Sequence, residues 1–406
     1  MALRKIEDLL TKHVTALKAR GTAKGAEKVV TGIKAAADGF SERYFLAGHG
    51  ERAFLRMNSN SYLGLALHQR LIASEAQAAE QFGTGPGAVR FISGTYQPHV
   101  ELEKALATFH GRESAMVMSA AYATVMGVLP QLVTDSTLVV SDALNHNSII
   151  TAIRLAHPAA RAVYPHLDMQ ALNALLDTNK GKVKRVCVVT DGVFSMRGDH
   201  APLHDLTAIC QRHEAEYEEG IITIVDDSHG VGALGRTGRG TEEQTDARAD
   251  VFIATLGKAL GVNGGYVVSN ASVIAYLRET VPFYIYSNPI TPAEAAAALT
   301  ALRILDSDEG LALLARVRAR SMQLRTALTA LGYETIMGDH PIVPLFIRDT
   351  EETAALVEYL FAHDILVTGL TYPIVPKGEE EIRLQVSATQ TEHDIDYVVE
   401  TLKHFK

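Results

Sequence analysis

The feature that most constrains the fold is a series of short apolar runs separated by stretches of helical periodicity. The runs are residues 115–118, 137–140, 185–189, 221–225, 251–254 and 265–268. Continuous Val/Ile runs that alternate with helices predict a mainly parallel sheet that is buried on both faces and flanked by helices. Ligands of such α/β sheets lie beyond the carboxyl ends of the strands.

Polar residues directly follow several of these runs, where a ligand site is expected. They are Ser119, Ser141, Asp142, Thr190, Asp191, Asp226, Asp227 and Thr255. Beyond residue 288, two prolines precede an alanine-rich helical stretch, and the remainder mixes helices with strands. We predict an N-terminal helix and arm over residues 1–57, a large domain over 58–288 and a smaller α+β domain over 289–406.

Composition excludes some classes of function. The formal net charge of −9 argues against nucleic acid, which needs a basic surface. No run reaches the ~18 apolar residues of a membrane span, and the first residues lack the apolar stretch of a signal peptide. Cys187 and Cys210 lie in apolar or helical patterns, which indicates buried thiols. We therefore expect a cytoplasmic protein without a membrane span.

Lys258 carries the main chemical signal. It lies in a small-residue turn just after the run 251–254, and Asp226 and His229 follow the preceding run. This pattern suits pyridoxal 5′-phosphate (PLP): the lysine forms a Schiff base, the acid pairs with the pyridinium nitrogen, and the Thr255 hydroxyl holds phosphate. A strand-end acid alone is often a helix cap and a lone histidine is often structural, but the three together favour the cofactor site.

Three further signals are weaker. Residues 119–123 follow a strand and open a helix, whose first amides can bind phosphate. His146 is either a residue that stacks on the cofactor ring and polarises a carbonyl, or a buried structural histidine. Arg383, in an alternating apolar run, either holds an amino-acid carboxylate or forms a structural ion pair. No Cys/His cluster has metal-ligand spacing, so we expect no metal site.

These segments together resemble the α-oxoamine synthases, which are fold-type I PLP enzymes. The resemblance runs from residue 58 nearly to the C-terminus, and its most specific segments are 90–95, 142–146, 190–196, 226–229 and 255–258. Within the family, residues 372–378 with Ser387 and Ala388 are most similar to the 2-amino-3-ketobutyrate CoA ligase branch (glycine C-acetyltransferase). The resemblance implies a homodimer with shared active sites.

The resemblance also assigns roles to residues. Lys258 would bind the cofactor aldehyde, Asp226 its ring nitrogen, His229 and Ser195 its phenolic oxygen, and His146 would stack on the ring. The phosphate would be held by the amides of Ala121 and Tyr122, the hydroxyl of Thr255, and Ser287 and Asn288 of the partner subunit. Asn60 and Arg383 would contact the substrate carboxylate.

The implied reaction is the condensation of a small amino acid with an acyl-CoA, which releases CoA with or without loss of CO₂. Glycine is the first expectation, with alanine or serine as alternatives. Val125, Gln390 and the short loop 261–265 depart from the family's common pattern, so the acyl group stays open. An aminotransferase of the same fold and a non-catalytic partner subunit are the competing hypotheses; residues 90–95 and 142–146 argue against the first, and Lys258 against the second.

Overall fold

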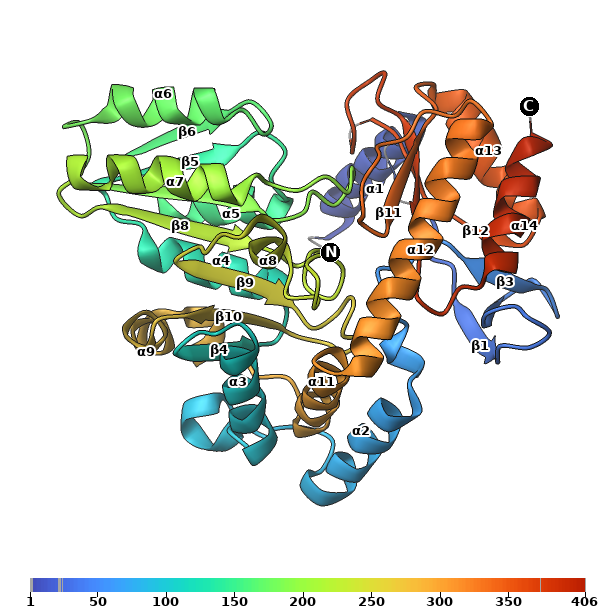
Figure 1. Ribbon diagram of the computed structural model, residues 1–406, viewed down its shortest axis with the longest axis horizontal. Coiled ribbons are helices and arrows are strands. Elements are labelled where there is room, and N and C mark those ends of the chain that lie inside the picture. Colours follow the sequence, from blue (N-terminus) through green and yellow to red (C-terminus); the bar gives the residue numbers. More distant parts are fainter. Residues whose placement is uncertain (1–2, 21–22, 24, 373, 406) are drawn as a thin grey trace.

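The computed structural model describes residues 3–20, 23, 25–372 and 374–405. Its largest sheet has seven strands in the order β4-β10-β9-β8-β7-β5-β6 (Figure 1). Their bounds are β4 (Ser114–Met118), β5 (Thr137–Asp142), β6 (Ala160–Tyr164), β7 (Arg185–Asp191), β8 (Ile221–Asp226), β9 (Val251–Thr255) and β10 (Gly265–Ser269). Only β10 runs antiparallel to its two neighbours in this sheet. The mainly parallel α/β fold is therefore confirmed.

The six apolar runs of the sequence correspond to six of these strands. The strand that the sequence analysis missed is β6, at the edge of the sheet, which pairs only with β5 among the described residues. Its side chains alternate between partly buried and exposed, and Val163 is 63% exposed. An edge strand with one solvated face lacks the continuous apolar run of a central strand, which is why the pattern did not reveal it.

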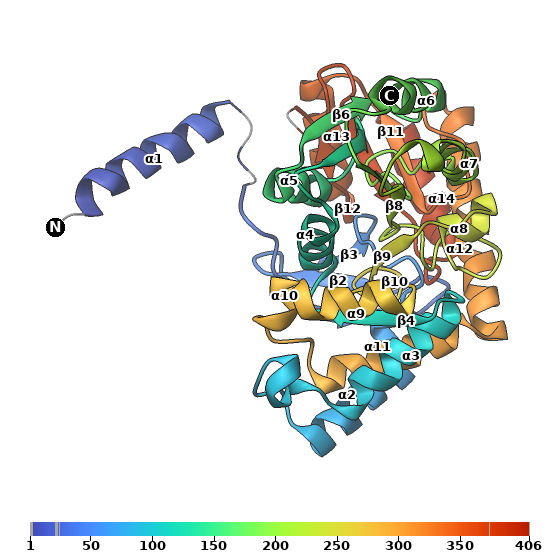
Figure 2. The same cartoon turned by 90° about the vertical axis from the view of Figure 1, so that its left-hand side faces the viewer.

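Helices cover both faces of the sheet. Figure 2 shows α4 and α5 on one side of the strands and α7 and α8 on the other. The helices of this part are α4 (Ala121–Leu132), α5 (Asn147–Ala156), α6 (Met169–Asn179), α7 (Leu203–His213), α8 (Thr241–Thr245), α9 (Ala271–Thr280) and α10 (Pro282–Ile285). Successive strand residues enter different cores: Phe252 packs in one cluster and Ile253 in another.

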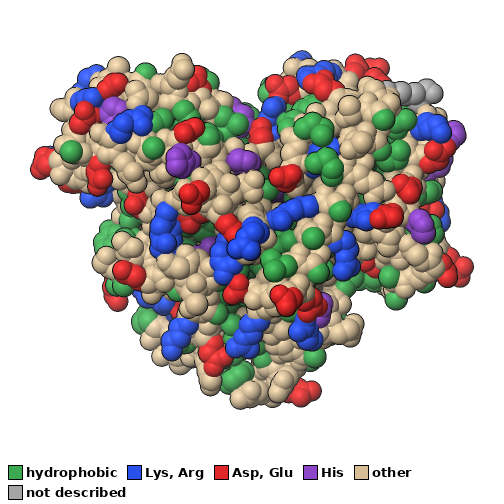
Figure 3. Space-filling view, viewed as in Figure 1, with side chains coloured by type: hydrophobic (Ala, Val, Ile, Leu, Met, Phe, Trp, Pro, Cys, Tyr) green, Lys and Arg blue, Asp and Glu red, His purple; other side chains and the backbone are tan. Residues whose placement is uncertain are grey.

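The C-terminal part forms a second lobe around a three-stranded sheet of order β11-β14-β13. The elements after residue 290 are α11 (Pro292–Leu305), α12 (Asp308–Ala330), β11 (Ile342–Phe346), α13 (Thr350–Ala362), β12 (Ile365–Leu366), β13 (Gly369–Leu370), β14 (Glu381–Gln385) and α14 (Glu392–Lys403). Of these, α11 lies outside the lobe, beside α2 (Gln69–Phe82) and α3 (Gln97–Phe109) (Figure 1). The molecular surface is hollowed between this lobe and the one that carries β5 to β8 (Figure 3).

The N-terminal part joins both lobes. Its elements are α1 (Leu3–Ala19), β1 (Val30–Lys34), β2 (Arg43–Leu46), β3 (Ala53–Arg56), α2 (Gln69–Phe82) and α3 (Gln97–Phe109), with short helices at Leu65–Leu67 and Arg90–Gly94. A further short helix, Glu214–Glu216, lies between α7 and β8. Strands β1, β2 and β3 form a sheet that ends in β12 of the C-terminal part. Helix α1 projects away from the body (Figure 2), and none of its residues is buried.

Two simpler predictions can also be compared with the structure. Cys187 and Cys210 are buried and unbridged, as predicted. Among the described residues, no helix combines the length and the apolar character that crossing a membrane requires.

Candidate active site

The carboxyl ends of β7, β8 and β9 meet at one edge of the large sheet, because these strands are parallel. Asp191 and Asp226 end neighbouring strands in register with each other, and Lys258 follows three residues after β9. A cavity of about 280 Å³ opens at this edge. Its lining includes eight of the predicted site residues: Ala121, Tyr122, His146, Ser195, Asp226, His229, Thr255 and Lys258.

The electrostatics around Lys258 favour a reactive amine. Burial lowers the pKa of its ammonium group from 10.5 to about 8, while the carboxylates of Asp226 and Asp191 act in the opposite direction. A lysine amine is nucleophilic only when it has lost its proton. The site therefore holds an amine that is deprotonated far more often than a surface lysine near neutral pH.

Asp226 is a buried carboxylate at the end of β8. Its Oδ1 accepts hydrogen bonds from the amide of Ser228 (3.1 Å) and from the Ser228 hydroxyl (2.5 Å). These bonds fix the orientation of the carboxyl group. A fixed carboxylate beside a cationic ring nitrogen is the arrangement that keeps such a nitrogen protonated.

Asp191 is a member of the site to which the sequence analysis assigned no role. Burial, together with the nearby Asp226, raises the pKa of its carboxyl group well above the usual value. Its Oδ2 accepts the backbone amide of His146 at 2.7 Å, which anchors the turn that carries this histidine. In the sequence, Asp191 could be suspected only from its position just after an apolar run. The register of the two strands shows that Asp191 and Asp226 share one site.

His146 is the N-terminal cap of α5, and its ring is neutral at physiological pH because burial lowers its pKa. The Nδ1 atom accepts a hydrogen bond from the amide of Ser148 at 3.2 Å. A neutral imidazole that accepts at Nδ1 carries its proton on Nε2. His146 thus offers an N–H donor, and its ring also contacts Tyr122 edge-on, with centroids 6.2 Å apart.

The two residues predicted to bind a substrate carboxylate, Asn60 and Arg383, contact each other. Arg383 donates from Nη2 to Oδ1 of Asn60 at 3.2 Å, and Gln385 donates to the same oxygen at 2.6 Å. The Nε atom of Arg383 is buried without a hydrogen-bond partner among the described residues. A buried guanidinium with a free donor is suited to an incoming carboxylate.

Tyr62 links this pair to the Lys258 cavity, although the sequence analysis gave it no role. Its hydroxyl lies 2.7 Å from Nδ1 of His229 and 3.4 Å from Oδ1 of Asn60. Burial, and then the charge of Lys258, lowers the pKa of His229 well below the usual value, so this ring is neutral. A chain of hydrogen bonds therefore runs from Arg383 to the wall of the cavity.

The predicted phosphate site lies where β10 passes the beginning of α4. Ala120, the residue before α4, has no side chain that could cap the helix, so the first amides of α4 have no side-chain partner. The first two residues of the helix, Ala121 and Tyr122, line the cavity. A Cβ atom on Gly265 would lie 2.3 Å from the nitrogen of Ala121, so only glycine permits this close approach. Thr255 lies beside it and accepts the amide of Gly257 at 3.0 Å.

Ser287 and Asn288 are not among the residues that line the cavity. They follow α10, where Asn288 is exposed and Ser287 is partly exposed, and the neighbouring Tyr286 is 78% exposed. Their predicted role requires a second subunit, so it stays a prediction.

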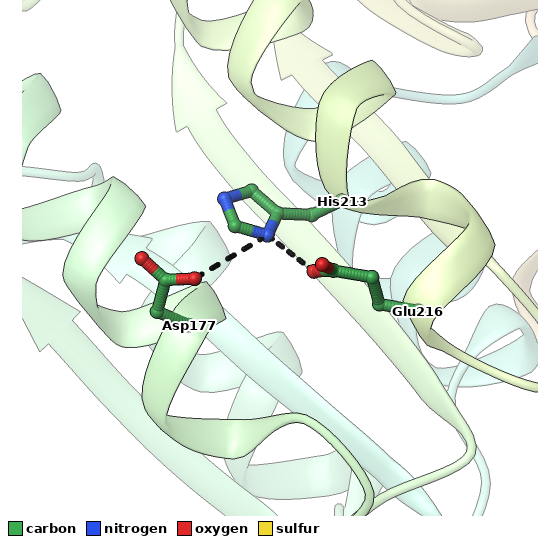
Figure 4. A group of neighbouring side chains, drawn as sticks. All are labelled: Asp177, His213 and Glu216. Carbon is green, nitrogen blue, oxygen red and sulfur yellow. Dashed lines mark hydrogen bonds and ion pairs between the residues drawn. The ribbon is translucent and has the colours of Figure 1, made fainter.

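A separate cluster of Asp177, His213 and Glu216 has the composition of a metal site (Figure 4). None of the three lines the Lys258 cavity. The ammonium group of Lys180 binds both carboxylates, at 2.6 and 2.8 Å, and Nδ1 of His213 lies 2.6 Å from Glu216. Lys180 therefore pairs with both acids, and we interpret the cluster as a surface ion-pair network rather than a metal site.

Comparisons with known proteins agree with this geometry. The aminotransferase class I and II family matches residues 52–402. The 8-amino-7-oxononanoate synthase of Geobacter sulfurreducens is 40% identical over 86% of this chain and 88% of its own length. Human mitochondrial 2-amino-3-ketobutyrate coenzyme A ligase is 36% identical over 98% of this chain and 92% of its own.

A solved structure completes the comparison. Serine palmitoyltransferase from S. paucimobilis, with a bound PLP–myriocin aldimine, superposes with a TM-score of 0.87 at 26% identity, covering 99% of this chain and 97% of that one. The residues at the sheet edge fit the same cofactor: an amine at Lys258, a carboxylate at Asp226, and a helix start that Gly265 leaves open. The chain belongs to the α-oxoamine synthases, PLP-dependent acyltransferases that condense an amino acid with an acyl-CoA.

Proposed function

We propose that this enzyme condenses glycine, as in the 2-amino-3-ketobutyrate CoA ligase branch, with an acyl-CoA. The observation that carries the proposal is the hydrogen-bonded chain that connects Arg383 and Asn60 with the cavity of Lys258. The human ligase aligns with 98% of this chain, including its N-terminal region, whereas the Geobacter sulfurreducens synthase aligns with 86%. This coverage supports the ligase branch.

Each residue has a proposed task in the reaction. When bound, PLP supplies an electron sink for the electron pair that is left when the Cα–H bond of the amino acid breaks. Asp226 keeps a proton on the ring nitrogen. Lys258, whose pKa of about 8 leaves its amine partly deprotonated, takes the proton from Cα.

Arg383 and Asn60 orient the amino acid. The guanidinium group holds the substrate carboxylate, and the Asn60 amide fixes the guanidinium group in turn. A fixed carboxylate sets which bond at Cα stands perpendicular to the plane of the cofactor ring, and only that bond is activated. Gln385, two residues after Arg383 on β14, supports this arrangement by donating a hydrogen bond to Asn60.

His146 and Ser195 complete the site. The Nε2–H group of the neutral His146 donates to the thioester carbonyl oxygen, which becomes more negative as the new carbon–carbon bond forms. Ser195 and His229 hold the phenolic oxygen of the cofactor. The amides of Ala121 and Tyr122 with the Thr255 hydroxyl hold its phosphate.

The proposed homodimer supplies Ser287 and Asn288 to the phosphate of the partner subunit. These residues lie outside their own cavity, beside the exposed Tyr286. Helix α1 adds a second argument, because its apolar stripe of Leu3, Ile6, Leu9, Leu10 and Val14 is 48–67% exposed. An isolated helix with an uncovered apolar face is marginal in water, and a second copy of the chain would cover it.

The two free buried cysteines suit the reducing cytoplasm.

The test is a CoA-release assay with glycine, alanine and serine, each combined with a series of acyl-CoA donors. We expect release of CoA to depend on the amino acid, with the highest kcat/KM for glycine. Lys258→Ala removes the amine and should abolish release. A higher kcat/KM for alanine or serine would refute glycine as the acceptor, and amino-group transfer to a keto acid without CoA release would refute the condensation.

A further inference from the structure

A second cavity lies beside the Lys258 cavity and shares Ser195 with it. It measures about 110 Å³, and its walls are mostly apolar. The large domain contributes Leu144, Phe194 and Met196, and the C-terminal part contributes Phe346, Ile374 and Val375. The two cavities therefore adjoin at Ser195, and the second offers apolar walls that suit methylene groups.

Glu381 is an acidic residue in the lining of this second cavity. It is 1% exposed, and its Oε1 atom has no hydrogen-bond partner among the described residues. Glu381 lies two positions before Arg383 on β14, so both side chains leave the same face of the strand. A buried polar atom without a partner is uncommon in a folded protein, and a ligand can supply the missing partner.

We propose that this second cavity receives the acyl chain of the acyl-CoA, and that Glu381 excludes chains that end in a carboxylate. The inference rests on the condensation proposed above and specifies its donor. At about 30 Å³ per water-sized group, the volume of the cavity corresponds to roughly four carbon atoms. A second carboxylate would be desolvated next to Glu381, and once Glu381 is ionised the like charges in this buried site repel strongly.

Arg197 also lines the cavity but does not offer a free cation to such a carboxylate. Its Nε donates to Oδ2 of Asp199 at 2.9 Å, and its Nη1 lies 4.0 Å from Glu379. Arg197 therefore already has acidic partners, of which Asp199 is shared with His166. A neutral chain end avoids this repulsion, and one with a hydroxyl group can also donate a hydrogen bond to the free oxygen of Glu381.

The charge of the Glu381 side chain changes within the pH range of an enzyme assay. Burial raises its pKa to about 8; Arg383 and Arg197 oppose this shift, whereas Glu379 and Asp199 reinforce it. Below pH 8 the carboxyl group is mostly protonated, and above pH 8 it is an anion. Discrimination against a carboxylate-ended chain should therefore increase as the pH rises from 7 to 9.

The experiment compares pentanoyl-CoA with glutaryl-CoA, which has the same number of acyl carbons but a carboxylate end. The ratio of their kcat/KM values for CoA release, with saturating glycine, is measured at pH 7 and pH 9. We expect pentanoyl-CoA to be preferred at pH 9 by at least about tenfold, and Glu381→Gln to remove most of that preference. The control Glu334→Gln removes an exposed acid paired with Arg348 and should leave the ratio unchanged.

A second variant tests where the acyl chain lies and leaves Glu381 unchanged. Val375→Phe adds a ring to the cavity wall and should move the optimum to shorter donors. An unaltered chain-length optimum, or an unaltered pentanoyl-to-glutaryl ratio in Glu381→Gln, would overturn the inference while CoA release persists. Failure of the wild-type enzyme to release CoA from any donor with glycine, alanine or serine would refute the condensation itself, and the inference with it.

Discussion

Replacing Asp226 by asparagine should make Lys258 more reactive in the cofactor-free protein. Burial lowers the pKa of Lys258 to about 8, and Asp226 is the strongest of the groups that oppose this shift. With that pKa about one amine in ten is neutral at pH 7, against about one in three thousand at 10.5. Removal of an anion that stabilises the ammonium form lowers the pKa further, so reactivity at pH 7 should rise, by at most about tenfold.

The assay is competitive labelling of the cofactor-free enzyme with a small amine-reactive reagent between pH 6 and pH 10. Mass spectrometry quantifies the Lys258 peptide relative to the exposed Lys184. We expect the wild-type midpoint near 8 and a lower midpoint in Asp226→Asn. Asp191→Asn should shift it less, because the raised pKa of Asp191 leaves that group less charged near neutral pH. A wild-type midpoint near 10.5, or an upward shift in Asp226→Asn, would refute this account.

Three further variants test other parts of the site. Arg383→Ala should raise the KM for glycine about 100-fold while the absorbance of bound PLP is retained, because it removes a charged partner of the carboxylate. Tyr62→Phe removes the 2.7 Å contact with His229 and should lower kcat/KM about tenfold in steady-state assays. Gly265→Ala places a Cβ atom 2.3 Å from the nitrogen of Ala121 and should weaken PLP binding at least about tenfold in equilibrium titrations, with unchanged circular dichroism.

The large sheet could be predicted from the sequence because its central strands are buried on both faces. Such strands carry continuous apolar runs, and their register then places the polar residues that follow them at one edge. The edge strand β6 has no such run, and it was missed. Lys258, Asp226 and His146 could be named for the same reason, since Asp226 ends a central strand and the other two follow one.

The remainder of the site depends on contacts that no local pattern encodes. Tyr62 and Arg383 lie more than 300 residues apart, and only the packing of the C-terminal lobe brings Arg383 to Asn60. The second cavity combines Phe194 with Ile374 for the same reason. The ion-pair cluster around His213 also joins α6, α7 and the short helix Glu214–Glu216, so no pattern in the sequence indicated that Asp177 belongs to it.

The pairing of β3 with β12 has a consequence for synthesis of the protein in the cell. Leu55 is paired with Ile365, 310 residues later, so β3 emerges from the ribosome long before its partner. At about 5–20 residues per second, the nascent chain waits roughly 15–60 s for that strand. The sheet that carries Lys258 is complete by residue 269, and a translating chain can therefore assemble its vitamin-binding half well before it acquires Arg383.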